Sequence, residues 1–201
     1  MTEYPNWFES TARVNFERFL AHKRGFPEFM ALQIGAFVGH ASEWMLRNLI
    51  TGKNATLHDV DTWQGSNEAA HDGFDWSKVE ETYYDRVKNW RWTHRLTCFK
   101  MTSDKFFEAL DAPESFVRDG YGYDFVYVDG SHKADDVYRD AVNAWKWLRP
   151  RGTIAFDDYK WSDGVSKPEE LPKAAIDRFM FEHAGQFRLL EYGYQVWLRK
   201  L

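Results

Sequence analysis

Three carboxylates follow two strongly apolar stretches of the sequence, each at the point where the stretch ends. Asp129 follows Tyr123–Val128, and the adjacent pair Asp157 and Asp158 follows Thr153–Phe156. If both stretches are parallel strands of one sheet, their carboxyl ends bring the three acids to the same edge. Clustered carboxylates repel one another unless a cation lies between them, and Mg²⁺ prefers oxygen ligands. The alternatives are a helix cap by Asp157 or Asp158, or hydrogen bonding without a metal.

His132 stands close behind Asp129, in the run Asp129-Gly130-Ser131-His132. The pKa of an unperturbed histidine lies near neutrality, so a histidine at this edge can act as a general base. The alternative is a histidine that only packs against the next helix or caps its start. The other histidines show no spacing typical of ligands.

A glycine turn follows the apolar stretch Met30–Ile34 and precedes a helical pattern. It reads Gly35-Ala36-Phe37-Val38-Gly39. Glycine lets the backbone turn tightly and approach a ligand closely. A Cβ at Gly35 would then intrude on the ligand, and Gly35→Val is expected to abolish binding while leaving the fold largely intact. The turn could equally serve chain geometry alone.

Asp61 lies at the end of the next predicted strand, Thr56–Val60. A carboxylate in this place can accept hydrogen bonds from both ribose hydroxyls of a nucleotide. Asp59 would point the same way, but Asp61 lies further out along the strand. A solvated loop aspartate is the alternative for Asp61.

Apolar strands alternate with helical patterns along most of the chain, which is typical of a mainly parallel sheet with helices on both faces. The last two strands are too close in sequence for a helical crossover and must form an antiparallel hairpin. We expect a single α/β domain over residues 1–201, with an N-terminal helical segment at 1–29 and a Rossmann-like, seven-stranded sheet. The expected strands are Met30–Ile34, Thr56–Val60, Arg95–Phe99, Tyr123–Val128, Thr153–Phe156, Phe187–Glu191 and Gln195–Arg199. The expected helices are Asn6–His22, Ala41–Ile50, Trp76–Trp90, Ser103–Leu110, Lys133–Leu148 and Pro172–His183.

The 201-residue chain has a formal net charge of −5, whereas surfaces that follow nucleic acid phosphates are usually basic. We therefore expect a small molecule rather than nucleic acid as the substrate, although Lys88, Arg91 and Arg95 could form a local basic patch. One cysteine excludes an internal disulfide. No membrane span and no signal peptide are recognisable, so a cytoplasmic protein is expected. A homodimer is compatible with the sequence.

Five motifs in this order resemble class I S-adenosylmethionine (SAM)-dependent methyltransferases. They are the glycine turn at 35–39, Asp61-Thr62-Trp63-Gln64-Gly65, Asp129-Gly130-Ser131-His132, Asp157-Asp158-Tyr159 and Tyr194-Gln195-Val196-Trp197. The resemblance is closest to small bacterial and phage enzymes that carry a DGSH box, and macrocin-type sugar O-methyltransferases are more distant. It covers most of the chain, from about Leu32 to Lys200. The chain departs from many relatives at Gln33 and Thr102, where they carry an acid.

The resemblance implies a role for each matching residue. The methionine part of SAM would be wrapped by Gly35, Ala36, Phe37 and Gly39, with Ser42 touching its carboxylate. Asp61 would hold the ribose, Trp63 would cover the adenosine, Thr102 and Ser103 would contact adenine, and Asp129 would face the sulfonium. Metal-dependent relatives place their cation at the positions of Asp129, Asp157 and Asp158.

These features predict methyl transfer from SAM to a hydroxyl of a small molecule, with His132 and Asp129 as catalytic residues and a divalent cation as an aid. Trp63, Trp76, Trp90 and Trp92 would suit a sugar-like or aromatic acceptor. They could equally be packing residues. The alternatives are a SAM-fold enzyme of the hydroxylase type and a non-catalytic SAM-binding module.

Overall fold

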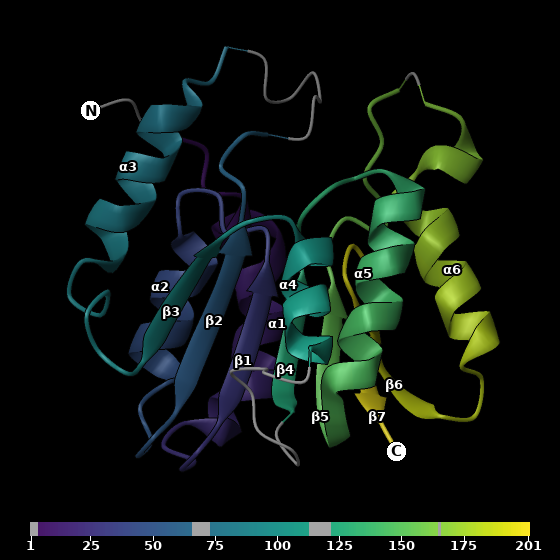
Figure 1. Cartoon of the computed structure of the whole chain (residues 1–201). Coiled ribbons are helices and arrows are strands. Elements are labelled where there is room, and N and C mark those ends of the chain that lie inside the picture. Colours follow the sequence, from purple (N-terminus) through teal and green to yellow (C-terminus); the bar gives the residue numbers. More distant parts are fainter. Residues whose placement is uncertain (1–3, 66–72, 113–121, 165) are drawn as a thin grey trace.

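The computed structural model describes residues 4–65, 73–112, 122–164 and 166–201. Its centre is one sheet with the strand order β3-β2-β1-β4-β5-β7-β6. The strands are β1 (Met30–Ile34), β2 (Thr56–Asp61), β3 (Leu96–Lys100), β4 (Tyr123–Val128), β5 (Leu148–Phe156), β6 (Phe187–Tyr192) and β7 (Val196–Lys200). The first five are parallel, and β7 pairs antiparallel with both β5 and β6 (Figure 1). This confirms the Rossmann-like fold predicted from the sequence.

Helices cover both faces of the sheet (Figure 1). One group contains α1 (Arg13–Leu20), α2 (His40–Asn48) and α3 (Trp76–Val87), and the other contains α4 (Ser103–Asp111), α5 (Ala134–Trp147) and α6 (Pro172–Glu182). Short helical turns, Phe8–Ala12 and Ala21–Lys23, extend α1 at its two ends, and Pro168–Glu170 precedes α6. The predicted N-terminal helix is therefore present as a chain of three segments. No helix in the described part of the chain is long and apolar enough to cross a membrane.

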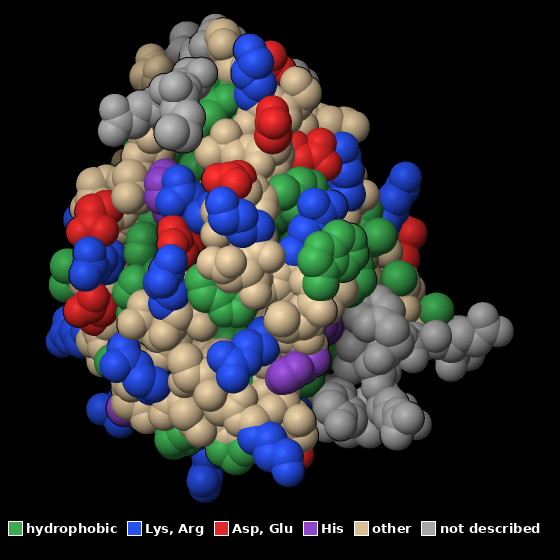
Figure 2. All heavy atoms as spheres, turned by 90° about the vertical axis from the view of Figure 1, so that its left-hand side faces the viewer, with side chains coloured by type: hydrophobic (Ala, Val, Ile, Leu, Met, Phe, Trp, Pro, Cys, Tyr) green, Lys and Arg blue, Asp and Glu red, His purple; other side chains and the backbone are tan. Residues whose placement is uncertain are grey.

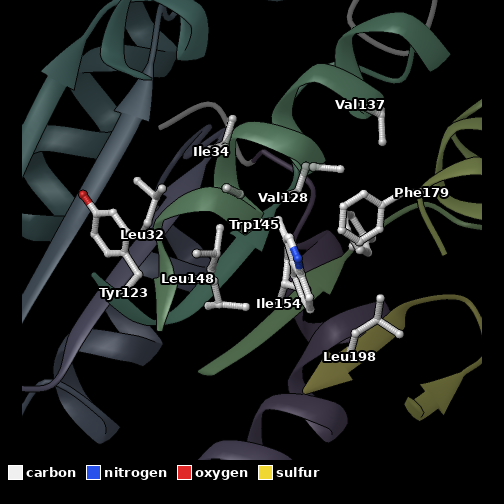
Figure 3. Packing of buried hydrophobic residues seen from close by; sticks show 14 of the residues in the cluster. Leu32, Ile34, Tyr123, Val128, Val137, Trp145, Leu148, Ile154, Phe179 and Leu198 are labelled. Carbon is white, nitrogen blue, oxygen red and sulfur yellow. The ribbon is translucent and has the colours of Figure 1, made fainter. Parts of the chain in front are cut away.

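Alternating side chains of the strands divide the core into two layers, because successive residues of a strand point to opposite faces. In β1, Leu32 packs in the layer under α4, α5 and α6, whereas Ala31 packs in the layer under α1, α2 and α3. Figure 3 shows the first layer, in which Trp145 of α5 and Phe179 of α6 close over Ile154. In the second layer Phe16 of α1 places its ring 4.9 Å from that of Tyr127. Both layers are buried, so the sheet is a rigid support for whatever follows its strands.

The start of β5 differs from the prediction. The strand was expected to begin at Thr153, but it begins at Leu148, which pairs with Tyr123 of β4. The register between these strands shifts directly afterwards, and Arg151 has a φ of 66°. A bulge of this kind keeps the chain in the sheet where Pro150 and Gly152 suggested a turn.

Charged side chains of both signs cover the side of the molecule on which α2, α3 and β3 lie, as Figure 2 shows. Several of them form ion pairs, such as Lys88 with Asp85 and Lys100 with Glu80. Trp92 is 85% exposed on the segment between α3 and β3, and Arg91 lies against its ring.

Candidate active site

A cavity of about 510 Å³ lies at the carboxyl ends of β1, β2, β4 and β5. The chain leaves β1 toward α2 on one face of the sheet and leaves β4 toward α5 on the other face. Because β1 and β4 are neighbours, a crevice opens between the two departing segments. Most of the residues singled out in the sequence line this cavity.

The glycine turn forms one wall. Gly35 and Gly39 have φ angles of 84° and 82°, a region that glycine adopts easily. A Cβ built on Gly35 would lie 1.9 Å from the backbone oxygen of Asp129. The expectation that Gly35→Val leaves the fold largely intact is therefore wrong, because the side chain would separate β1 from β4. A Cβ on Gly39 would meet Tyr83 at 2.9 Å, away from the cavity.

Asp61 lines the cavity at the end of β2. Its Oδ2 accepts hydrogen bonds from the backbone N–H groups of Ala36 and Phe37, at 2.7 and 2.9 Å, and its Oδ1 accepts one from Trp63 at 2.7 Å. The carboxylate thus shapes the glycine turn as well as facing the cavity. Asp59, the competitor for this role, is fully buried and accepts a hydrogen bond from the Tyr83 hydroxyl at 2.6 Å.

Besides Gly39, two residues of the expected SAM set lie behind the cavity wall rather than on it. Ser42 is fully buried and donates a hydrogen bond to Gln33 Oε1 at 3.2 Å. Trp63 is 3% exposed, packs against Tyr83 and donates from Nε1 to the carbonyl of Phe37 at 2.9 Å. They support the glycine turn in this structure. By contrast, Gly35, Ala36, Phe37, Thr102, Ser103 and Asp129 all line the cavity.

The three acids predicted to meet at one edge do so. Asp129, Asp157 and Asp158 each present a carboxylate oxygen within 4.8 Å of the others. Burial, followed by repulsion from the two neighbours, raises the pKa of Asp129 well above its usual range. Burial and the charge of Asp158 raise the pKa of Asp157 to about 7. Carboxylates this close repel one another when ionised, and a cation bound between them would relieve that repulsion.

His132 lies beside this acidic cluster. Its Nε2 is 2.8 Å from Asp158 Oδ2, and its ring stacks on Trp161 with the ring centroids 4.4 Å apart. The Tyr194 hydroxyl donates to the other oxygen of Asp158 at 3.0 Å. Asp158 therefore orients the imidazole, and it is itself held by the turn between β6 and β7.

Gln195 was not predicted as a site residue. It is fully buried, and its Nε2 donates to Asp157 Oδ1 at 2.7 Å. Its Oε1 accepts from Asn15 of α1 at 3.0 Å and from Trp197 at 2.9 Å. Two donors at the oxygen fix the amide so that its nitrogen faces Asp157. The signals in the sequence were its place in the motif Tyr194-Gln195-Val196-Trp197 and its position directly after a predicted hairpin turn.

Residues 32–159 match the family described as methyltransferase domain. Among solved structures, the O-methyltransferase TomG from Streptomyces achromogenes in complex with SAM has a TM-score of 0.60 at 19% identity, covering 86% of this chain and 73% of that one. The O-methyltransferase from Bacillus cereus in complex with SAH has a TM-score of 0.59 at 15% identity, covering 100% and 93%. The N-methyltransferase NodS from Bradyrhizobium japonicum has a TM-score of 0.56 at 13% identity, covering 97% of both chains. No curated protein matches the sequence significantly.

The sheet order, the glycine turn and the acid that follows β2 define a class I SAM-dependent methyltransferase. Because the matched region is more than half of its length, the chain belongs to the methyltransferase domain family. The resemblance drawn from the five motifs is thus confirmed at the level of the family.

Proposed function

We propose that this methyltransferase transfers the methyl group of SAM to a hydroxyl oxygen of a small acceptor. The observation that carries the proposal is that one cavity joins the glycine turn and Asp61 to the acidic cluster and His132. A methyl donor held at the first place would present its methyl group toward a base and acids at the second. Two solved O-methyltransferases of the same fold, with SAM and SAH bound, support this reading.

The donor would lie along the glycine turn. Backbone of Gly35, Ala36 and Phe37 lines the cavity beside Asp61, which would accept hydrogen bonds from the ribose hydroxyls. Tight positioning of this kind supplies much of the rate enhancement in a displacement at carbon, because the two reactants must be in line.

A divalent cation such as Mg²⁺ fits the donor set of Asp129, Asp157 and Asp158. Three carboxylates whose oxygens lie within 4.8 Å are hard ligands, and a positive charge between them would relieve the repulsion that, together with burial, raises the pKa values of Asp129 and Asp157. When bound, the cation would lower the pKa of an acceptor hydroxyl and orient it.

His132 is the base in this proposal. As the acceptor oxygen bonds to the methyl carbon and the carbon–sulfur bond breaks, the hydroxyl proton passes to the imidazole. Asp158, 2.8 Å from Nε2, would stabilise the imidazolium that results. Stacking on Trp161 holds the ring in place.

The acceptor would lie against aromatic side chains. Trp7 and Phe8 of the N-terminal segment, Trp76 of α3 and Trp161 all line the cavity. Flat apolar walls of this kind suit the face of an aromatic or sugar ring. From the sequence we also expect the loop from Gln64 to Asp75 to help enclose the acceptor, and most of this loop lies outside the described residues.

Calorimetric titration with SAM, SAH and NAD tests the donor, and consumption of SAM across an acceptor library of phenols, catechols and sugars tests the reaction. We expect SAM and SAH to bind and NAD not to bind. Turnover should stop with EDTA and return with Mg²⁺, while SAM affinity stays nearly unchanged. Full activity in EDTA would reject the cation, and SAM binding without turnover of any hydroxyl acceptor would favour a binding module.

A further inference from the structure

Asp140 of α5 is a buried acid that faces the cavity. It is 5% exposed and belongs to the lining residues. Its carboxyl group accepts a hydrogen bond from the hydroxyl of Ser103 at the start of α4, but among the described residues it has no backbone N–H donor and no ion pair. A buried carboxylate without such partners is costly, so its place at the cavity suggests a ligand that supplies a donor.

The part of the cavity beside Asp140 is an apolar slot. Ile34, Val60 and Met101 line it and belong to one packed cluster. Gly130 lies between this slot and the acid, since a Cβ there would be 3.3 Å from Ile34 Cγ2 and 3.8 Å from Asp140 Oδ2. The slot therefore has apolar walls and a hydrogen-bond acceptor near its end.

The slot is continuous with the proposed ribose site. The backbone N–H of Met101 donates to the carbonyl of Asp61 at 3.1 Å, so the segment after β3 runs beside the end of β2. A base attached to a ribose held by Asp61 can extend along Met101 toward Asp140. Thr102, which stands where many relatives carry an acid, uses its hydroxyl to accept a hydrogen bond from Lys105 at the start of α4.

Charge decides which end of SAM fits this slot. Burial, and after it the charges of the nearby Asp104 and Asp136, raises the pKa of Asp140 to about 7. Arg139, the nearby cation, is paired with these same two acids. Such surroundings disfavour a carboxylate and favour a neutral group that donates hydrogen bonds. Adenine has two flat faces and an exocyclic amine at its edge, which matches the slot.

We propose that Asp140 accepts a hydrogen bond from the exocyclic amine of adenine and makes the site select adenine over hypoxanthine. The inference rests on the proposed binding of SAM. Hypoxanthine carries a carbonyl oxygen where adenine carries the amine, so it would face the carboxylate with an acceptor. Loss of one hydrogen bond to a buried acid, with an acceptor facing the acid in its place, corresponds to about a tenfold or larger change in affinity.

The test is calorimetric titration with two probes, SAH and S-inosylhomocysteine, which differ at that edge of the base. The wild-type protein should bind SAH at least tenfold more tightly. Asp140→Asn should weaken SAH binding about tenfold. It should also reduce or reverse the preference for SAH over S-inosylhomocysteine, because the asparagine amide can donate to the hypoxanthine oxygen. Asp135→Asn is the matched control, since it removes a charge from the same helix at an exposed position that does not line the cavity, and it should keep the wild-type ratio.

The outcomes separate this inference from the proposed function. If the wild-type protein binds neither probe, the proposed SAM site itself fails. If it binds both equally, the role of Asp140 is refuted without any variant. The same holds if Asp140→Asn, shown by circular dichroism to be folded, keeps the wild-type ratio of the two affinities.

Discussion

Gln195→Leu should destabilise the protein far more than an average substitution, because it removes the amide that joins α1 to the acidic cluster. The side chain is fully buried and makes hydrogen bonds with Asp157, Trp197 and Asn15. Leucine has a similar volume, so the main loss is of polar partners rather than of packing. Trp197 is fully buried, so its indole N–H cannot donate to water instead.

The expected loss in the free energy of unfolding follows from the two buried groups that lose a hydrogen-bond partner. Trp197 loses its acceptor and Asp157 loses the amide donor at 2.7 Å, and the loss of a partner costs a buried polar group roughly 1–3 kcal/mol. Asn15 is only partly buried, and water can replace its lost acceptor. We therefore expect a loss of about 3 kcal/mol, which for a chain of this size lowers the Tm by roughly 6–12 °C.

Urea unfolding followed by circular dichroism measures this loss. Asn15→Ala is the matched variant, because it removes one partly solvated hydrogen bond of the same network and should cost about 1 kcal/mol. A Gln195→Leu protein within 1 kcal/mol of the wild type would show that the network contributes little and would refute the reasoning.

Other substitutions and conditions give further expectations. Asp61→Ala should weaken SAM binding at least tenfold by calorimetry, or about 1.4 kcal/mol, and unchanged affinity in the folded variant would contradict the ribose role. Gly35→Val should yield insoluble or unfolded protein, and a soluble variant with native circular dichroism would contradict the clash with Asp129. His132→Ala should abolish turnover while leaving SAM affinity unchanged, and retained turnover would assign the base elsewhere. Burial raises the pKa of Asp59 to about 7, whereas aspartate in an unfolded chain titrates near roughly 4. Between these two pKa values the folded protein holds a proton that the unfolded chain releases. The free energy of unfolding should therefore fall as the pH rises from about 4 to 7, and urea titrations at these two pH values check this. Asp59→Asn should make the free energy of unfolding depend less on pH.

Most of the fold was predictable because the strands are apolar, short and bounded by glycine or polar residues. The predicted bounds of β1 and β4 agree with the structure to the residue. The helix predicted to reach Trp90 ends at Val87, and β5 begins earlier than expected. Helix ends and bulges depend on backbone angles such as that of Arg151, which side-chain patterns do not encode.

The acidic cluster was predictable for a topological reason, since parallel strands deliver the residues that follow them to one edge. Gln195 was not, because its partners Asp157 and Asn15 are 38 and 180 residues away. Asp140 could not be predicted for a similar reason, since the sequence pattern does not distinguish it from the other polar residues of an amphipathic helix. Contacts between distant segments decide which polar residue joins a site, and one sequence does not reveal them.

The place of β7 in the sheet has a consequence for synthesis of the protein. β7 follows every other strand in sequence, yet it lies between β5 and β6. While the nascent chain emerges from the ribosome, β5 therefore has an open edge until Val196–Lys200 have been made. Unpaired edges of this kind invite association between chains. β5, which Asp157 and Asp158 directly follow, is thus the last of the parallel strands to receive a neighbour, and slow synthesis of the segment between β5 and β7 should increase the demand for chaperones.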